Sequence, residues 1–200
     1  MENSLGWKAI DNALDNLYQR KENKHFAPEI VPSLGGDDYL EGVSVYFNES
    51  NYHYHYISYG LSELHEKVSE DSKYSGWGYE LTFRLKKVEG EEEIPTWPVN
   101  LLEQVAKATY ENEIIFDAYH TIFSGPVDPE SNTKIEAILF VKDPELGTIQ
   151  TEFGEVTFLQ LFGLTESEYE GITEKSIDRR AFIKKEQLTN PQLITDITRG

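Results

Sequence analysis

The chain has 200 residues, no cysteine, and a formal net charge of −18 from 18 basic and 36 acidic side chains. This length favours one domain with a single hydrophobic core, and the missing cysteines exclude a disulfide framework, a thiol nucleophile and cysteine-ligated zinc or iron–sulfur sites. The negative charge argues against nonspecific binding to nucleic acid or to an anionic membrane, because like charges repel, and it leaves a basic protein as a suitable partner.

The first part of the chain predicts one helix followed by strands. Apolar residues at helical spacing predict an amphipathic helix over 5–20, with Ser4 as its N-cap. An irregular connector over 28–36 follows, where proline and glycine are frequent. Alternation over 43–48 then predicts a half-buried strand, and the aromatic run over 52–59 predicts a second one.

The clearest strand pattern covers residues 79–88. Its apolar face carries Tyr79, Leu81, Phe83 and Leu85, and its polar face carries Glu80, Thr82, Arg84 and Lys86. We expect the apolar face to pack in the core and Arg84 to pair with a carboxylate on the polar face. The polar stretch over 69–78 before it is expected to be a loop.

The second part of the chain predicts a helix, two strands and a further helix. Prolines and mutually repelling glutamates over 89–98 interrupt the sheet, and helical spacing resumes around 101–109. Apolar runs over 135–141 and 155–162 predict strands, and residues 165–168 match a capping box that begins a helix. The pattern predicts an α+β fold with a mixed or antiparallel sheet flanked by helices.

The sequence also predicts where the protein works. No apolar run approaches the ~20 residues of a membrane-spanning helix. The first twenty residues lack the basic start and apolar core of a signal peptide. We therefore expect a single domain over residues 1–200, located in the cytoplasm, with no membrane partner.

Two histidines on one predicted strand are the first candidates for chemistry. His53 and His55 lie two positions apart, so both imidazoles point to the same face. With His65 or His120 folded beside them, they would hold zinc with an open coordination position. The alternative, which we favour, is a hydrogen-bonded layer of aromatic strand residues without a metal.

Motifs for catalysis are missing from the sequence. It contains no HExxH pattern, no Walker-type lysine loop, no dinucleotide fingerprint and no GxSxG elbow. Carboxylate pairs are so frequent in an acidic chain that they carry little catalytic information. The sequence therefore predicts no enzyme, no catalytic residue and no cofactor.

Several longer motifs resemble those of the suppressor of fused family. They are HYHYISYGLSELHEK from His53, SGWGYELTFRLK from Ser75, PTWP from Pro95, DPEL from Asp143 and TEFGEVTFLQLFGLT from Thr151. The N-terminal GWKAIDNALDNLY and the C-terminal LITDITR resemble the bacterial, single-domain branch of that family. These segments follow the family order over nearly the whole chain.

The resemblance implies an α+β binding protein without enzymatic activity. Bacterial members are associated with polymorphic toxin loci, where they act as immunity proteins that neutralise the nuclease domain of a secreted toxin. The branch that this chain resembles pairs with an LXG-type toxin. Animal members instead sequester a transcription factor, which makes a regulatory scaffold the alternative function.

An acidic immunity protein would suit a nuclease, because nucleases present cationic grooves for phosphate. In animal members the segment between the GLS and SGFG-like motifs helps to grip the partner, which favours contacts in the corresponding loop of this chain. Acidic connectors provide the other candidates. The expected partner contacts are His65, Glu70, Asp71, Glu89, Glu91, Glu92 and Glu93. The sequence leaves the oligomeric state open.

Overall fold

The fold is organised around a mixed β-sheet, which the computed structural model describes within residues 4–19 and 21–200. Helices and strands alternate irregularly along the chain, as expected for an α+β protein. The elements are α1 (Leu5–Tyr18), β1 (Lys24–Phe26), the 3-10 helix η1 (Pro32–Leu34), β2 (Gly42–Asn48), β3 (His53–Tyr59), β4 (Tyr74–Lys86), α2 (Trp97–Asn112), β5 (Thr121–Phe123), β6 (Ile135–Lys142), β7 (Thr148–Thr151), β8 (Gly154–Thr165), α3 (Glu166–Thr173) and α4 (Arg179–Glu186).

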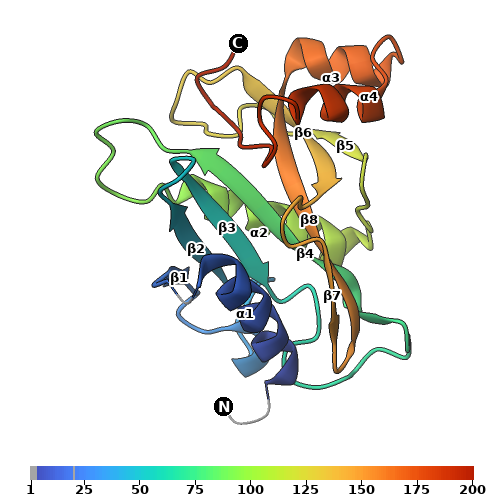
Figure 1. Cartoon of the computed structure of the whole chain (residues 1–200). Helices are drawn as coiled ribbons and strands as arrows, with labels where there is room; N and C mark the ends of the chain where they lie inside the picture. The colour runs from blue at the N-terminus through green and yellow to red at the C-terminus, as the bar shows by residue number, and fades with distance from the viewer. Residues whose placement is uncertain (1–3, 20) are drawn as a thin grey trace.

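The strands form one eight-stranded sheet in the order β1-β2-β3-β4-β8-β6-β5, with β7 paired to β8 outside this path (Figure 1). The central pair β4–β8 is parallel, and all other named pairs are antiparallel. A parallel pair needs a long crossover, and here the crossover contains α2, β5, β6 and β7. The arrangement confirms the predicted α+β class with a mixed sheet flanked by helices.

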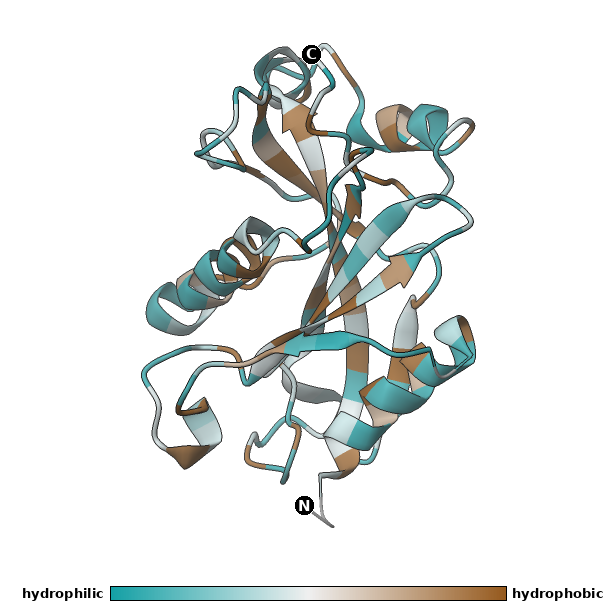
Figure 2. Cartoon of the chain, turned by 90° about the vertical axis from the view of Figure 1, so that its left-hand side faces the viewer, coloured by the Kyte–Doolittle hydropathy of each residue, from teal (hydrophilic) through white to brown (hydrophobic). Residues whose placement is uncertain are grey.

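Helices cover both faces of the sheet, as the nearly edge-on view in Figure 2 shows. On one face, Leu102, Val105 and Ala106 of α2 pack into a core with alternate residues of β2, β3, β4, β6 and β8. On the other face, Ile10 and Leu14 of α1 pack over β3 and β8, while α3 and α4 cover β6 and the end of β8. Both sides of the central strands are therefore removed from water.

This double coverage corrects the predicted burial of the strands. β2 is buried at every position over 42–46, so the prediction of a half-buried strand was wrong. The polar side chains Glu80, Thr82 and Arg84 of β4 are also fully buried. A sheet covered on both faces buries alternate residues of either chemistry, and the polar ones must then find partners inside the protein.

β4 begins five residues earlier than the apolar alternation predicts, so the predicted loop over 69–78 is strand from Tyr74 onward. Gly76 and Gly78 adopt left-handed backbone conformations, with φ of 55° and 83°. The pairing of β4 with β8 shifts register between Tyr74 and Tyr79. The sequence places the two glycines in a loop, whereas in the structure they lie in the irregular first part of β4.

The three predicted helices are present and differ from the predictions mainly at their ends, whereas α4 was not predicted. α1 ends at Tyr18, and Arg20, the last residue of the predicted helix, lies outside the described residues. Ser4 precedes α1 as predicted, but its side chain makes no cap and bonds to His65 instead. The capping box at the start of α3 is confirmed. In the described part of the chain, no helix is long and apolar enough to cross a membrane.

Candidate protein-binding surface

The loop between β3 and β4 is held in shape by the carboxylate of Glu63. This carboxylate accepts hydrogen bonds from the backbone N–H groups of Val68 and Ser69, both at 2.6 Å, and of Gly76 at 3.0 Å. The ammonium of Lys67 adds an ion pair at 2.9 Å. Burial opposes ionisation, but these donors outweigh it and lower the pKa of Glu63 to about 2. The loop is thus anchored around a carboxylate that stays charged at neutral pH.

Three of the predicted contact residues lie exposed on this anchored loop, namely His65, Glu70 and Asp71, and we call them the β3–β4 surface. Asp71 accepts hydrogen bonds from the N–H groups of Lys73 and Tyr74, which lower its pKa. The Nδ1 atom of His65 lies 3.0 Å from the hydroxyl of Ser4, so this histidine also links the loop to the start of α1. The surface is therefore preorganised rather than loose.

The first turn of α1 packs against the same loop, so a substitution at Gly6 tests how much this contact stabilises the fold. A Cβ atom at Gly6 would lie 2.0 Å from the Glu63 carbonyl oxygen. Alanine is the better helix former by about 1 kcal/mol, yet this clash should make Gly6→Ala lower the free energy of unfolding by about 1–3 kcal/mol. Urea titration measures the change. Asn12→Ala on the exposed side of α1 is the control, and a Gly6→Ala variant as stable as the native chain would contradict the prediction.

The other four predicted contacts lie in the segment between β4 and α2, and we call them the β4–α2 surface: Glu89, Glu91, Glu92 and Glu93. All are exposed except Glu91, which is half-buried. The ammonium of Lys87 fastens this segment by donating to the Tyr54 hydroxyl at 2.6 Å and to the Glu91 carbonyl. One carboxylate oxygen of Glu91, Oε2, is buried and has no hydrogen-bond partner among the described residues.

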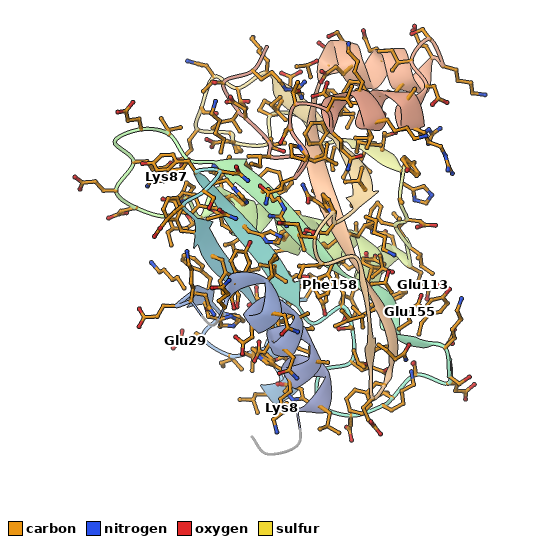
Figure 3. All side chains as sticks on the ribbon, viewed as in Figure 1. Lys8, Glu29, Lys87, Glu113, Glu155 and Phe158 are labelled. Atoms are coloured by element: carbon orange, nitrogen blue, oxygen red, sulfur yellow. The ribbon has the colours of Figure 1, made fainter. Side chains whose placement is uncertain are left out.

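The structure does not bring the two surfaces together. They lie at opposite ends of β4, whose 13 residues span about 40 Å at roughly 3.3 Å per step. Figure 3 shows the same separation between Lys87 at one end and Glu155, beside the start of β4, at the other. A standard interface of about 800 Å² per partner is only about 30 Å across. An interface of this standard size therefore covers one of these surfaces and not both.

His55 belongs to a buried polar network and not to a surface site. Its Nε2 lies 3.1 Å from the carboxylate of Asp143, and its Nδ1 lies 2.7 Å from the hydroxyl of Tyr18. Because the carboxylate only accepts, Nε2 carries the proton and Nδ1 accepts from Tyr18. The hydroxyl of Thr82 also donates to Asp143, at 2.9 Å. All four side chains are buried.

The guanidinium of Arg84 occupies the centre of this network. It donates to Asp143 at 3.2 and 3.3 Å and to the amide oxygen of Gln160 at 3.2 Å. Its Nη1 lies 2.8 Å from the carboxylate of Glu145 and 3.1 Å from Nε2 of His53. The prediction that Arg84 pairs with a carboxylate is confirmed, but the pair is fully buried, between the part of the sheet under α1 and the part under α3 and α4.

The charges in this network bear on whether His53 and His55 could bind a metal ion. Burial and the nearby Arg84 cation lower the pKa of His53 to about 3 and that of His55 to about 4. Burial would raise the pKa of Asp143, but the hydrogen bond from His55 and the Arg84 charge hold it far below its ordinary value. Among the described residues, no three or more histidine, aspartate or glutamate side chains are arranged so that they could hold a metal ion. His53 and His55 form the hydrogen-bonded layer, and the guanidinium beside them would repel a metal cation.

Glu80 forms a second buried polar cluster that the sequence pattern placed only on a polar strand face. Its carboxylate accepts from the N–H of Gly60 at 3.0 Å, from the N–H and hydroxyl of Ser62 at 2.9 and 2.6 Å, and from the hydroxyl of Ser58 at 2.5 Å. Burial raises the pKa of Glu80, although these hydrogen bonds act to lower it. The cluster ties β4 to the turn that leads into the β3–β4 surface.

Comparison with known proteins identifies relatives of this architecture. A family model described as suppressor of fused protein (SUFU) matches residues 36–200. The suppressor of fused homolog of Homo sapiens is 36% identical over 218 residues, which cover 98% of this chain and 43% of the human protein. The homolog of Mus musculus is 35% identical with the same coverage. The chain thus spans less than half the length of these relatives.

Solved structures share the fold. The Sufu-Fu complex crystal structure contains a chain that superimposes with a TM-score of 0.87 at 28% identity, covering 99% of this chain and 92% of that one. Drosophila Suppressor of Fused gives the same TM-score and identity, with 100% and 51% covered. A SUFU homolog from Neisseria gonorrhoeae gives a TM-score of 0.64 at 14% identity, with 98% and 95% covered, which shows similarity of fold alone.

Proposed function

Because this chain belongs to the suppressor of fused family, we propose that it works by binding a protein partner. The partner we propose is the basic nuclease domain of an LXG-type toxin. The chain would neutralise this toxin as an immunity protein. The observation that carries the proposal is the β3–β4 surface, an anchored loop that exposes the carboxylates of Glu70 and Asp71 to solvent on a chain of net charge −18. A preformed acidic loop suits a cationic groove built for phosphate, because little ordering is needed on binding.

We assign the contacts first to the β3–β4 surface and second to the β4–α2 surface. The β3–β4 surface is fixed by Glu63, Glu80 and the start of α1, whereas the β4–α2 segment is held mainly through Lys87. Opposite charges accelerate association, up to about 10⁸–10⁹ M⁻¹s⁻¹ at low salt. Rapid capture is valuable when the partner damages nucleic acid in the cell that makes it.

Co-expression with the nuclease domain of a candidate LXG-type toxin tests the proposal. We expect cells to survive, the two proteins to co-elute, and the dissociation constant to rise about tenfold or more between 50 and 500 mM salt, since screening weakens exposed charge pairs. The paired variants Glu70→Gln/Asp71→Asn and Glu92→Gln/Glu93→Gln remove equal charge from the two surfaces. The first pair should weaken binding more. Continued killing by the toxin despite folded, soluble protein would overturn the proposal.

A regulatory scaffold is the second candidate, and one observation favours it. The chain superimposes over 92% of a protein chain in the Sufu-Fu complex crystal structure, so a domain of this fold takes part in a complex with another protein there. On this reading the present chain would sequester a cellular regulator. Tight association with such a regulator, together with failure to neutralise the candidate toxin, would favour the scaffold over the immunity protein.

A further inference from the structure

A hollow of about 700 Å³ opens on the sheet face that α2 covers, where the N-terminal ends of β4 and β8 separate. Its walls include Tyr74, Trp77 and Phe116, and its lining also includes three carboxylates: Asp71, Asp117 and Glu155. Pockets for small ligands have volumes of about 300–1,000 Å³, so this hollow has room for a group as large as an arginine side chain. None of the sequence motifs pointed to this hollow.

The irregular entry of β4 creates the hollow. Between the paired positions Tyr74 and Tyr79, four residues of β4 face a single residue of β8, so the ladder is interrupted there. The N–H groups of Gly76 and Trp77 turn away from β8 and bond to Glu63 and to the Leu61 carbonyl, at 3.0 and 2.9 Å. The anchoring of the β3–β4 loop therefore also holds the hollow open.

The charge of the hollow is negative and only partly balanced, because the ammonium groups of Lys67 and Lys73 interact electrostatically with Asp71, and that of Lys73 also with Glu155. Its carboxylates come from three separate elements, the β3–β4 loop, the α2–β5 segment and the start of β8. Within the described parts of the chain, no basic side chain makes an ion pair with any of the three. The nearby ammonium of Lys73 instead lies against Tyr74, 2.5 Å from its hydroxyl and 4.4 Å from the ring centroid.

Aromatic rings and carboxylates together favour a planar cation. A guanidinium stacks on indole and phenol rings and forms forked hydrogen bonds with carboxylates, which a compact ammonium does less well. Trp77 is only half-buried, with the ring of Tyr110 packed edge-on against it at 5.5 Å. We propose that this hollow is an anchor site for an arginine side chain of the basic protein partner, an inference that rests on the proposed function.

The test uses a small probe and does not need the toxin. Nα-acetyl-arginine N-methylamide is titrated into the labelled protein, and the three tryptophan indole N–H signals are followed by NMR. We expect saturable binding in the millimolar range that shifts the Trp77 signal alone. The citrulline analogue, which has nearly the same shape and no charge, should bind at least ten times more weakly.

Variants sharpen this test. Asp71→Asn/Asp117→Asn/Glu155→Gln should weaken arginine binding at least tenfold, whereas Glu89→Gln/Glu92→Gln/Glu93→Gln removes the same charge from the other end of β4 and should leave it unchanged. Lys73→Gln should strengthen binding about twofold, which a merely unfolded variant cannot do. Equal binding of citrulline, or no effect of the hollow variant, would overturn the arginine site. Failure to neutralise the toxin with arginine binding intact would overturn only the proposed function.

Discussion

Replacing Arg84 by methionine is expected to lower the free energy of unfolding by about 3–5 kcal/mol, the usual cost of breaking a buried ion pair from one side. The substitution keeps the length of the side chain but leaves the buried Asp143 carboxylate without its cation. It also removes the partners of Glu145, Gln160 and His53. Urea unfolding followed by circular dichroism measures the change.

The same strand supplies a matched control for this prediction. Lys86 lies two positions further along β4 on the same face and pairs with Asp196 at 2.6 Å, but its side chain is 57% exposed. Lys86→Met should therefore cost no more than about 1 kcal/mol. If Arg84→Met is as mild as Lys86→Met, the buried network does not stabilise the fold. Adding Asp143→Asn to Arg84→Met should cost less than the two single changes summed, because each single change leaves one buried charge without its partner and the double variant leaves neither.

Alternation and propensity predicted the central elements of this fold but not their surroundings. The apolar face of β4 and the aromatic run of β3 were correctly identified, because both depend only on neighbours in sequence. The partner of Arg84 could be predicted only as a class, since Asp143 is 59 residues away and reaches it through the β6–β7 turn. The partners of the buried Glu80 likewise lie about 20 residues away, at the end of β3 and in the turn after it. The short strands β1, β5 and β7 and helix α4 carry too few residues for a periodic signal.

The candidate surfaces show the same limit. Sequence reasoning selected exposed loop carboxylates from charge and family position, and the structure places them at opposite ends of one strand. It could not show that Glu63 fixes one of these loops, because that carboxylate acts through backbone N–H groups up to 13 residues away. The hollow beside Trp77 needs three segments that meet only in the folded chain.

Acidification is expected to destabilise the protein between about pH 6.5 and pH 4. This range begins at a higher pH than carboxylate titration alone would give. An unfolded histidine has a pKa of about 6.5, whereas burial lowers the pKa of His53 to about 3 and that of His55 to about 4. Within this window these two histidines bind protons in the unfolded chain but not in the folded chain, so the free energy of unfolding falls as pH falls. Each histidine contributes up to about 1.4 kcal/mol per pH unit.

Other buried groups set the limits of this window. The pKa of Asp143 is far below its ordinary value, so its stabilisation is present above about pH 4 and fades only in stronger acid. Glu80 acts in the opposite direction, because burial raises its pKa and the folded chain takes up that proton first. Its contribution therefore offsets part of the histidine effect near the acid end. The pKa values of Asp11 and Glu103 are raised as well, and that of His25 is lowered. The net slope should still be positive with pH, because the pKa values of His53 and His55 are lowered furthest, to about 3 and about 4.

Thermal unfolding from pH 8 to pH 4 measures this dependence, and variants assign it to the buried network. His53→Gln/His55→Gln is expected to be less stable at neutral pH, because the glutamines do not reproduce every hydrogen bond of the imidazoles, but to lose less stability on acidification. The control His120→Gln changes an exposed histidine and should keep the native slope. The prediction fails if the double variant shows the native pH slope, because the proton uptake on unfolding would then come from groups outside the network that holds Arg84.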